Sequence, residues 1–491
     1  MFTKFLRNIH KILGLPLSIL FFLWFASGIV MIYHSFPRAS QEKRIANLQP
    51  LPDMLPNLNL LSETLSDSAR LQSLTLEMYA GQPVLNLRGK NVPNRIYADS
   101  LVPMKPYDAR EIGMIVSQWC TASVLRVDTV YKPDQWIPFG RPEDFFPVYK
   151  YIFSDADKHE LYISPKDGKV LQMTDKSERL WAWLGAIPHW VYFTVLRQNQ
   201  PAWINFVKWT SGIGTIMCLA GFVLSLRIAW KNRNRRWGVP YRKRWYRWHH
   251  VSGLLFGIFA ATFAFSGMMS LMDIPDWLKK APKEQRREHP FRMSGGSKPI
   301  LPDSYVLDYR KAAQAATDIK QIEWASWNGH PYYRLTTAGQ TINIDASDST
   351  ATRLFILTEE RIRNEMQKMY GDSIRWEMEL ITEFDNDYFS RKREPNSLPV
   401  YRVSVDDDMH TRHYFNPQTL RQQRTDDDGR IRHLLYRGLH CLDFKFLTDH
   451  IWLWNIVMYT LMIGGTFLSL TGVILTFKWI IRNIKHIFHN N

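Results

Sequence analysis

The chain alternates between long apolar runs and long polar stretches. A helix that crosses a bilayer needs about 20 mostly apolar residues. Four runs meet this requirement, at residues 11–34, 204–229, 250–272 and 452–477. Between them lie two long polar stretches, at 35–203 and 273–451. The pattern predicts a membrane α-helical protein with four transmembrane helices and two large insertions in water.

The unit of helix, insertion and helix occurs twice. Two pairs of segments align without a gap: "HKILGLPLSILFFLWFASG" (10–28) with "HHVSGLLFGIFAATFAFSG" (249–267), and "FFPVYKYIFSDADKHELYISP" (145–165) with "SLPVYRVSVDDDMHTRHYFNP" (397–417). His189 precedes Gly221 by 32 residues, and His440 precedes Gly472 by the same 32. Because both copies start on the same side, we expect a parallel twofold repeat, related by a pseudo-twofold axis along the membrane normal.

The net charge of +16 is concentrated in three segments without acidic residues. They hold Lys4, Arg7 and Lys11; nine Lys and Arg residues from Arg227 to Arg247; and Lys478, Arg482 and Lys485. Together they account for fifteen of the sixteen charges. Basic residues gather on the cytoplasmic side of membrane proteins. We therefore expect both termini, the loop 230–249 and the tail 478–491 to be cytoplasmic and both insertions external. The charge indicates contact with membrane lipid and no nucleic-acid partner.

The insertions are predicted to be α+β domains. Helical patterns at 108–119 and 358–371 alternate with strand-like runs at 158–172 and 339–349. The three cysteines, Cys120, Cys218 and Cys441, show no spacing typical of a metal or redox motif. A disulfide framework is not expected.

The order of these motifs resembles the PepSY-associated transmembrane-helix family of bacterial inner-membrane proteins. The resemblance covers nearly the whole chain. It is carried by "DQWIPFGRPEDFFPVYKY" (134–151), its degenerate partner "DNDYFSRKREPNSLPVYRV" (385–403), and the His-x3-Gly…Ser-Gly helix starts. It implies two PepSY-like periplasmic domains, at 35–203 and 273–451. Some members resemble ferric-siderophore reductases with b-type haem between their helices, so haem b, in two copies, is the implied cofactor.

Histidines at the ends of membrane helices are the candidate ligands. An ionisable residue at such a position is a site hypothesis by default, and neutral imidazole supplies an axial nitrogen to haem iron. His10 and His249 are equivalent in the repeat and lie at the cytoplasmic end. His189 and His440 are equivalent on the outer side, and His34 adds a third outer nitrogen. Which two of these three touch iron stays open, and His250 competes with His249.

The leading interpretation is an enzyme, a haem-containing oxidoreductase that reduces an external ferric chelate such as siderophore iron. The sequence contains no GxGxxG after a strand, P-loop, HExxH or GxSxG motif. The electron donor is therefore another molecule, a quinol or a cytoplasmic flavoprotein. An aromatic and basic external cluster is a candidate surface for the chelate or part of the domain core: Trp136, Phe139, Arg141, Phe145 and Phe146. Two alternatives stay open: a non-enzymatic membrane-anchored module that binds or regulates a partner protein, and a transporter of iron chelates or haem.

Overall fold

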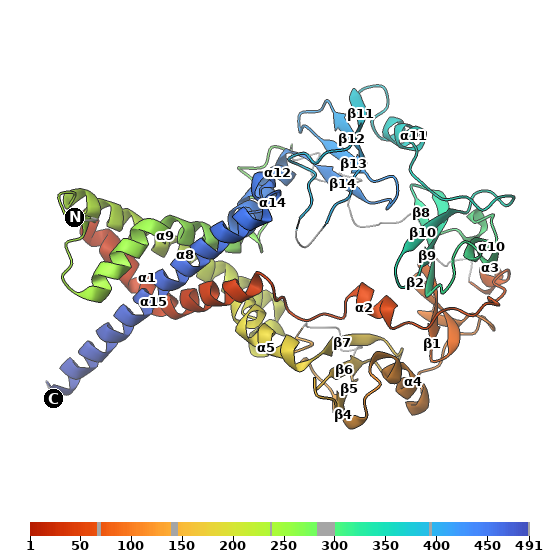
Figure 1. Cartoon of the computed structure of the whole chain (residues 1–491), viewed down its shortest axis with the longest axis horizontal. Coiled ribbons are helices and arrows are strands. Elements are labelled where there is room, and N and C mark those ends of the chain that lie inside the picture. Colours follow the sequence, from red (N-terminus) through yellow and green to blue (C-terminus); the bar gives the residue numbers. More distant parts are fainter. Residues whose placement is uncertain (66–69, 139–145, 236–237, 282–299, 392–394, 490–491) are drawn as a thin grey trace.

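Four long helices pack together as a bundle at one end of the molecule (Figure 1). The computed structural model describes residues 1–65, 70–138, 146–235, 238–281, 300–391 and 395–489, without the side chains of 485–489. The four helices are α1 (Phe2–Met31), α8 (Gln200–Lys231), α9 (Arg244–Met269) and α15 (Ile451–His489). All four are long and apolar enough to cross a membrane. The fold-class prediction is therefore confirmed.

The remaining elements belong to the two insertions. The first insertion contains α2 (Gln41–Ala46), α3 (Leu61–Thr64), β1 (Arg70–Tyr79), β2 (Gln82–Lys90), β3 (Arg95–Tyr97), α4 (Ala109–Trp119), β4 (Val124–Val130), β5 (Val148–Phe153), β6 (Glu160–Ile163), β7 (Val170–Thr174), α5 (Lys176–Leu184), α6 (Ala186–Trp190) and α7 (Thr194–Arg197). The second contains η3 (Pro302–Ser304), α10 (Tyr309–Ala313), β8 (Gln321–Trp327), β9 (His330–Thr336), β10 (Thr341–Asp345), α11 (Glu359–Tyr370), β11 (Trp376–Ile381), β12 (Val400–Val405), β13 (Arg412–Phe415), β14 (Gln422–Thr425), α12 (Asp427–His433), the π turn η4 (Leu434–Gly438), α13 (Leu439–Cys441) and α14 (Lys445–Thr448).

The membrane helices differ from the predicted spans mainly at their ends. Helix α1 starts at Phe2, well before the apolar run, and ends at Met31, which leaves His34 beyond the helix. Helix α9 starts at Arg244, so His249 lies inside its second turn. Helical hydrogen bonding continues through the basic flanks because long basic side chains keep their charges in water while the backbone stays helical.

The soluble helices begin where their sequences provide caps. The Asp108 carboxylate accepts a hydrogen bond from the Glu111 backbone, and the Glu111 side chain accepts one from the Asp108 backbone, which closes a capping box at the start of α4. Thr358 caps α11 in the same position of the second insertion. Both helices were expected from their apolar periodicity.

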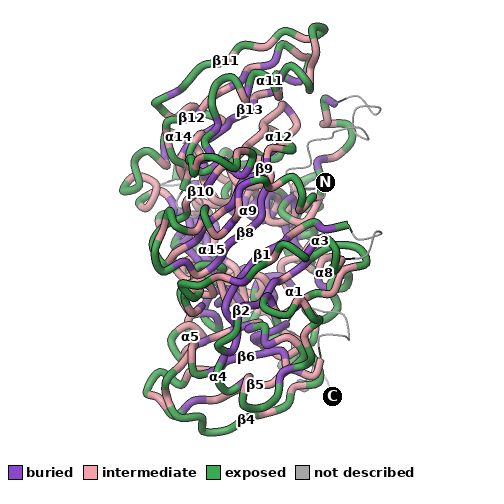
Figure 2. The backbone as a smooth tube through the Cα atoms, turned by 90° about the vertical axis from the view of Figure 1, so that its right-hand side faces the viewer, coloured by how far each residue is buried: buried purple, intermediate pink, exposed green. Residues whose placement is uncertain are grey.

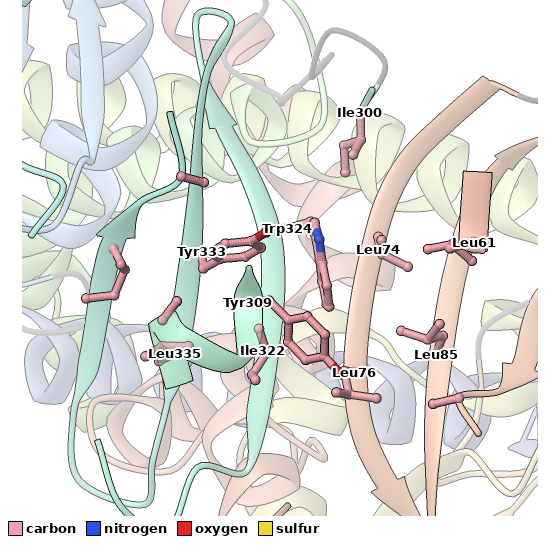
Figure 3. Close-up of a cluster of buried hydrophobic side chains, with 14 of the residues drawn as sticks. Leu61, Leu74, Leu76, Leu85, Ile300, Tyr309, Ile322, Trp324, Tyr333 and Leu335 are labelled. Carbon is pink, nitrogen blue, oxygen red and sulfur yellow. The ribbon is translucent and has the colours of Figure 1, made fainter. Parts of the chain in front are cut away.

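The two insertions are joined by one antiparallel sheet, which the sequence pattern did not indicate. Its strand order is β10-β9-β8-β1-β2-β3, so three strands come from each insertion. The junction is the β1–β8 pair, in which Leu74 lies opposite Trp324. Figure 3 shows the side chains packed here, and Leu74, Ile322 and Leu335 are fully buried. The insertions therefore fold against each other and are not two separate bodies.

Each insertion also has a four-stranded antiparallel sheet of its own. The orders are β4-β5-β6-β7 in the first and β11-β12-β13-β14 in the second. Figure 1 shows these sheets on opposite sides of the shared sheet, and Figure 2 shows buried residues along β1, β2 and β8 between them. The predicted repeat is thus visible in the topology of the soluble part.

The N-terminus, the α8–α9 connection and the C-terminal end of α15 lie at the same end of the bundle (Figure 1). Both insertions leave the bundle at the opposite end. This arrangement fits the positive-inside pattern, since all three basic segments share one side.

Candidate functional site

The bundle brings His10 and His249 together at the end that carries the termini. Their ring centres lie 5.9 Å apart with an angle of 37° between the rings. His10 comes from α1 and His249 from α9, which are equivalent helices of the repeat. We call these two residues the inner pair.

The hydrogen bonds of the inner pair determine which ring nitrogen carries the proton. His10 Nδ1 lies 2.9 Å from the Met217 carbonyl oxygen, which can only accept, so Nδ1 is the donor. His249 Nδ1 lies 2.9 Å from Thr471 Oγ1. That hydroxyl donates to the Leu468 carbonyl at 2.6 Å, so it accepts from His249. In both imidazoles the lone pair is therefore on Nε2.

The opposite end of the bundle brings His189 and His440 together in the same way. Their ring centres lie 6.0 Å apart with an angle of 56°. The short helices α6 and α13, which carry them, pack against α1 and α9 respectively. Each helix is followed by a left-handed residue, Val191 (φ 55°) and Leu442 (φ 51°). We call His189 and His440 the outer pair.

The outer pair uses Nδ1 as the donor as well. His189 Nδ1 donates to the Trp24 carbonyl at 3.0 Å. His440 Nδ1 lies 3.3 Å from the Phe263 carbonyl, at the position of the repeat equivalent to Trp24, and 3.1 Å from Ser266 Oγ. Burial, reinforced by the neighbouring His189, lowers the pKa of His440 to about 4, so this imidazole is neutral at physiological pH.

Left-handed backbone is rare for residues other than glycine, and strongly so for a β-branched one such as Val191. Two such residues at equivalent positions show that both copies of the repeat turn sharply directly after their outer histidine. The turn lets a short helix reach into the bundle before the chain enters the next span. The outer histidines are thus placed by backbone geometry that is present in both copies.

Glycines give the imidazoles room at equivalent positions of the repeat. A Cβ atom on Gly221 would come within 2.5 Å of the His10 ring, and one on Gly28 within 3.3 Å of the His189 ring. Gly472 and Gly267 occupy the equivalent places beside His249 and His440. The shared spacing of 32 residues therefore runs from an outer histidine to a glycine beside an inner histidine, across the bundle.

The family of the chain is now clear from comparison with known proteins. A family model described as "PepSY-associated TM region" matches residues 7–482. The chain belongs to this family. No curated protein matches it. The resemblance that the sequence motifs indicated is confirmed, and the PepSY-associated region includes all four histidines of the two pairs.

The structure does not bring His34 to either pair among the residues that it describes. Its ring stacks on Trp181 of α5, with centres 4.2 Å apart and an angle of 3°. Helix α1 ends at Met31, so His34 leaves the helical path before it can face the bundle interior. The outer imidazoles that the structure brings together are those of His189 and His440, whereas the ring of His34 lies against Trp181.

His250 points away from the inner pair. Its Nδ1 lies 3.5 Å from Ser225 Oγ, and its ring meets Tyr241 edge to face with centres 5.5 Å apart. The structure thus places His249, and not His250, beside His10. Of the predicted external aromatic cluster, residues 139–145 lie outside the described part of the chain; Trp136 is buried in the core of the first insertion.

The two pairs fit the coordination of one metal-centred group each. Two imidazoles that both bind one metal ion through nitrogen, with bonds of about 2 Å, would have their ring centres about 6 Å apart. Both pairs match this separation. A hydrogen bond through Nδ1 fixes the ring and leaves Nε2 for the metal, as is usual for metal-binding histidines. The sequence revealed the histidines but not the carbonyl partners on Trp24 and Met217, whose only signal was their place within the repeat.

Proposed function

We propose that this PepSY-associated membrane protein is an oxidoreductase that binds two b-type haems and reduces an external ferric chelate. The observation that carries the proposal is the presence of two symmetric histidine pairs, each with ring centres about 6 Å apart and with Nδ1 as donor. The shared tautomer leaves Nε2 of all four imidazoles with a lone pair that could bind a metal ion.

The four histidines would hold the haems in pairs. His10 and His249 would hold one haem, and His189 and His440 would hold the other. Haem iron supplies one-electron chemistry by cycling between its ferric and ferrous states. The carbonyls of Met217 and Trp24 keep the imidazoles oriented, so that little reorganisation accompanies a change of charge at the iron.

The bundle interior between the two pairs is filled mainly by buried apolar side chains. The inner and outer pairs are separated by 17 residues of α9 (His249 to Ser266), roughly 25 Å along the helix. Buried side chains fill this region, among them Phe21, Phe25 and Phe263. A dry, low-dielectric interior favours electron transfer between fixed sites and disfavours passage of a charged chelate.

Electrons enter from a quinol or a cytoplasmic flavoprotein and leave to a chelate that is too polar to enter the bilayer. One electron converts ferric to ferrous iron in the chelate, and the donor is oxidised in turn. We place the protein in the bacterial inner membrane, with the insertions in the periplasm and the outer pair beside the compartment that holds the substrate.

The decisive test is the absorption spectrum of the purified full chain. We expect two haems per chain and a reduced-minus-oxidised spectrum of low-spin b-type haem. Colourless protein from haem-replete cells would contradict the proposal and favour a non-enzymatic module that binds a partner protein. Uptake of iron chelate into proteoliposomes without any reductant would instead favour a transporter.

The charge pattern predicts the orientation of the chain. Reporter domains inserted after residues 100 and 350 are expected to be periplasmic, and one inserted after residue 236 cytoplasmic, because the basic segments resist translocation. Paired alkaline phosphatase and fluorescent-protein fusions measure this in whole cells. A periplasmic signal at 236 would reverse the orientation and with it the direction of electron transfer.

The repeat offers a matched pair of glycine substitutions. Gly221→Ala places a Cβ 2.5 Å from the His10 ring. In Gly472→Ala the nearest atom to the new Cβ is Cε1 of His249, at 3.5 Å, which is an ordinary contact distance. We expect Gly221→Ala to lower occupancy of the inner haem, since overpacking costs about 1–3 kcal/mol. Gly472→Ala should retain both haems. Haem content per chain and the thermal melt of each variant check this; equal loss in both variants would contradict the site geometry.

A further inference from the structure

A second group of potential metal ligands lies in the first insertion, far from the bundle. Cys120, Asp155 and His159 each offer a ligand atom, and these atoms lie within 4.8 Å of one another. Cys120 directly follows α4, while Asp155 and His159 lie in the turn between β5 and β6. All three residues are half-buried. Sequence spacing did not indicate this cluster because Cys120 is distant in the chain from the other two.

The backbone explains why the three residues meet. Strands β4 and β5 are paired, and beyond their ends Ser154 donates its N–H to the Ser123 carbonyl at 3.0 Å. This bond holds the β5–β6 turn beside the segment that leaves α4. The cluster therefore lies on a framework of sheet and helix and not on a loose loop.

Asp155 has a structural role in this turn. Its carboxylate accepts hydrogen bonds from the backbone N–H groups of Asp157, at 3.2 Å, and His159, at 3.1 Å. It also contacts His159 Nδ1 at 2.6 Å. The turn thus accounts for Asp155, but it does not account for the thiol of Cys120 or the imidazole of His159.

The second insertion provides the comparison, because it contains the same turn. Asp407 accepts the Thr411 N–H at 2.8 Å, as Asp155 accepts that of His159. Lys158 and His410 occupy the same left-handed position, with φ of 50° and 47°.

The closing hydrogen bond also matches: Phe153 N–H to His159 O at 3.0 Å in one turn, and Val405 N–H to Thr411 O at 2.9 Å in the other. Thr411 stands where the first turn has His159, and Gly371 ends α11 where Cys120 ends α4. The fold therefore requires the aspartate but neither the histidine nor the cysteine.

We propose that Cys120, Asp155 and His159 bind Zn²⁺ or a divalent cation of similar ligand preference. Thiolate, imidazole and carboxylate are the ligands that zinc takes, and three protein ligands leave the fourth tetrahedral position to water or another molecule. A cation would replace the proton shared by His159 and Asp155 and the proton of the thiol, so binding releases protons. The site is independent of the haem proposal, since it shares no residue with the histidine pairs.

The other cysteines do not compete for this role. All three cysteines lie in the described residues, and none forms a disulfide. Cys218 is buried within the membrane helix α8, and Cys441 lies in α13 next to His440. Cys120 is the cysteine of the described soluble part that has an imidazole and a carboxylate beside it.

Co²⁺ is the suitable probe because thiolate ligation gives it a charge-transfer band and tetrahedral geometry gives it strong ligand-field bands. Titration uses the full chain in detergent with its affinity tag removed, and each spectrum is read as a difference from the same sample before addition. We expect both bands to saturate at one equivalent of Co²⁺ and to disappear on addition of Zn²⁺. Absence of a thiolate band would overturn the proposal.

Variants taken from the second insertion make the test specific. His159→Thr introduces the residue that the equivalent turn already accepts, and Cys120→Ser removes the thiolate; each should abolish the thiolate band and weaken Zn²⁺ binding by at least about tenfold. Matched controls are Cys441→Ser and His410→Lys, the latter giving the second turn the lysine of the first. Both should keep the site. Retention in His159→Thr or Cys120→Ser, or loss in either control, would refute it.

Alkylation of cysteines in the unchanged chain tests the site even if a variant does not fold. Bound Zn²⁺ should slow alkylation of Cys120 by at least about tenfold, because the thiolate that reacts with the reagent would then be bound to the metal. Mass spectrometry locates the alkylated residue, with Cys441 as the internal reference. Equal alkylation of Cys120 with and without Zn²⁺ contradicts the site, and unchanged haem content shows that this result is separate from the function proposed for the bundle.

Discussion

Alanine at His10 or at His249 is expected to remove one haem and leave the other, so that haem content falls from two to about one per chain. Both substitutions should delete the same spectral component, because the two rings face each other at 5.9 Å and would share one iron. Loss of one axial imidazole leaves an iron position open and weakens retention of the group. Pyridine haemochrome analysis and low-temperature difference spectra of the two variants measure this.

His250→Ala is the sharpest control for this experiment. It is the next residue on the same helix, but its ring faces Ser225 and Tyr241. It should retain two haems, and so should His34→Ala, whose ring stacks on Trp181. Loss of the inner component in His250→Ala alone would mean that the helix register at this point is wrong. If His10→Ala and His249→Ala each still bind two haems, the inner pair does not hold a haem.

The repeat made the pairing of histidines predictable. His10 and His249 occupy the same place in two copies of one pattern, and so do His189 and His440. Equivalent residues that lie near a twofold axis meet across it, so symmetry supplied a contact between residues hundreds of positions apart. Apolar length alone supplied the number of membrane helices, which the structure confirms.

The choice between His249 and His250 could not be made from the sequence. Neighbouring residues on a helix point about 100° apart, so one of them faces the bundle axis and the other does not. Which one does so depends on how α9 is rotated against α8 and α15. Only the packed bundle shows that Thr471 accepts a hydrogen bond from His249 and that Ser225 lies beside His250.

The shared sheet could not be predicted from local sequence patterns either. Strand character can be recognised in a short window, but the partner of a strand depends on tertiary packing. Leu74 and Trp324 lie opposite each other although a whole membrane hairpin separates them in the chain. The cluster of Cys120 with His159 went unrecognised for the same reason, since its members come from two different elements.

Glycine positions were visible, but their purpose was not. Small residues in membrane spans usually allow helices to pack closely. In the structure Gly221 lies against the His10 ring and Gly28 against the His189 ring. A glycine gives no side chain whose chemistry indicates a ligand, so its role could be assigned only after its neighbour was known.

Removal of the outer pair is expected to have the largest effect on activity. In His189→Ala, His440→Ala and the double variant, reduction of an external ferric chelate should fall to the rate of vesicles without the protein. The reason is that the chelate stays outside the bilayer and electron transfer weakens steeply with distance, so the inner haem alone cannot reach it. The assay follows ferrous iron outside right-side-out vesicles, driven by an added quinol or by a reductant supplied inside.

The same variants should keep the inner haem reducible, which separates loss of the outer site from loss of the fold. His450→Ala is the matched control: His450 lies on the same side just before α15, but its Nδ1 contacts the Phe446 carbonyl of its own segment, at 3.3 Å. It should retain two haems and full ferric reduction. Each variant therefore requires three measurements: haem per chain, reduction of the remaining haem by the donor, and ferric reduction outside. If the double variant lacks the outer haem but reduces the chelate at the normal rate, electrons leave the bundle by another route. A double variant that still binds two haems would show that His189 and His440 are not the outer ligands, although their rings meet at 6.0 Å.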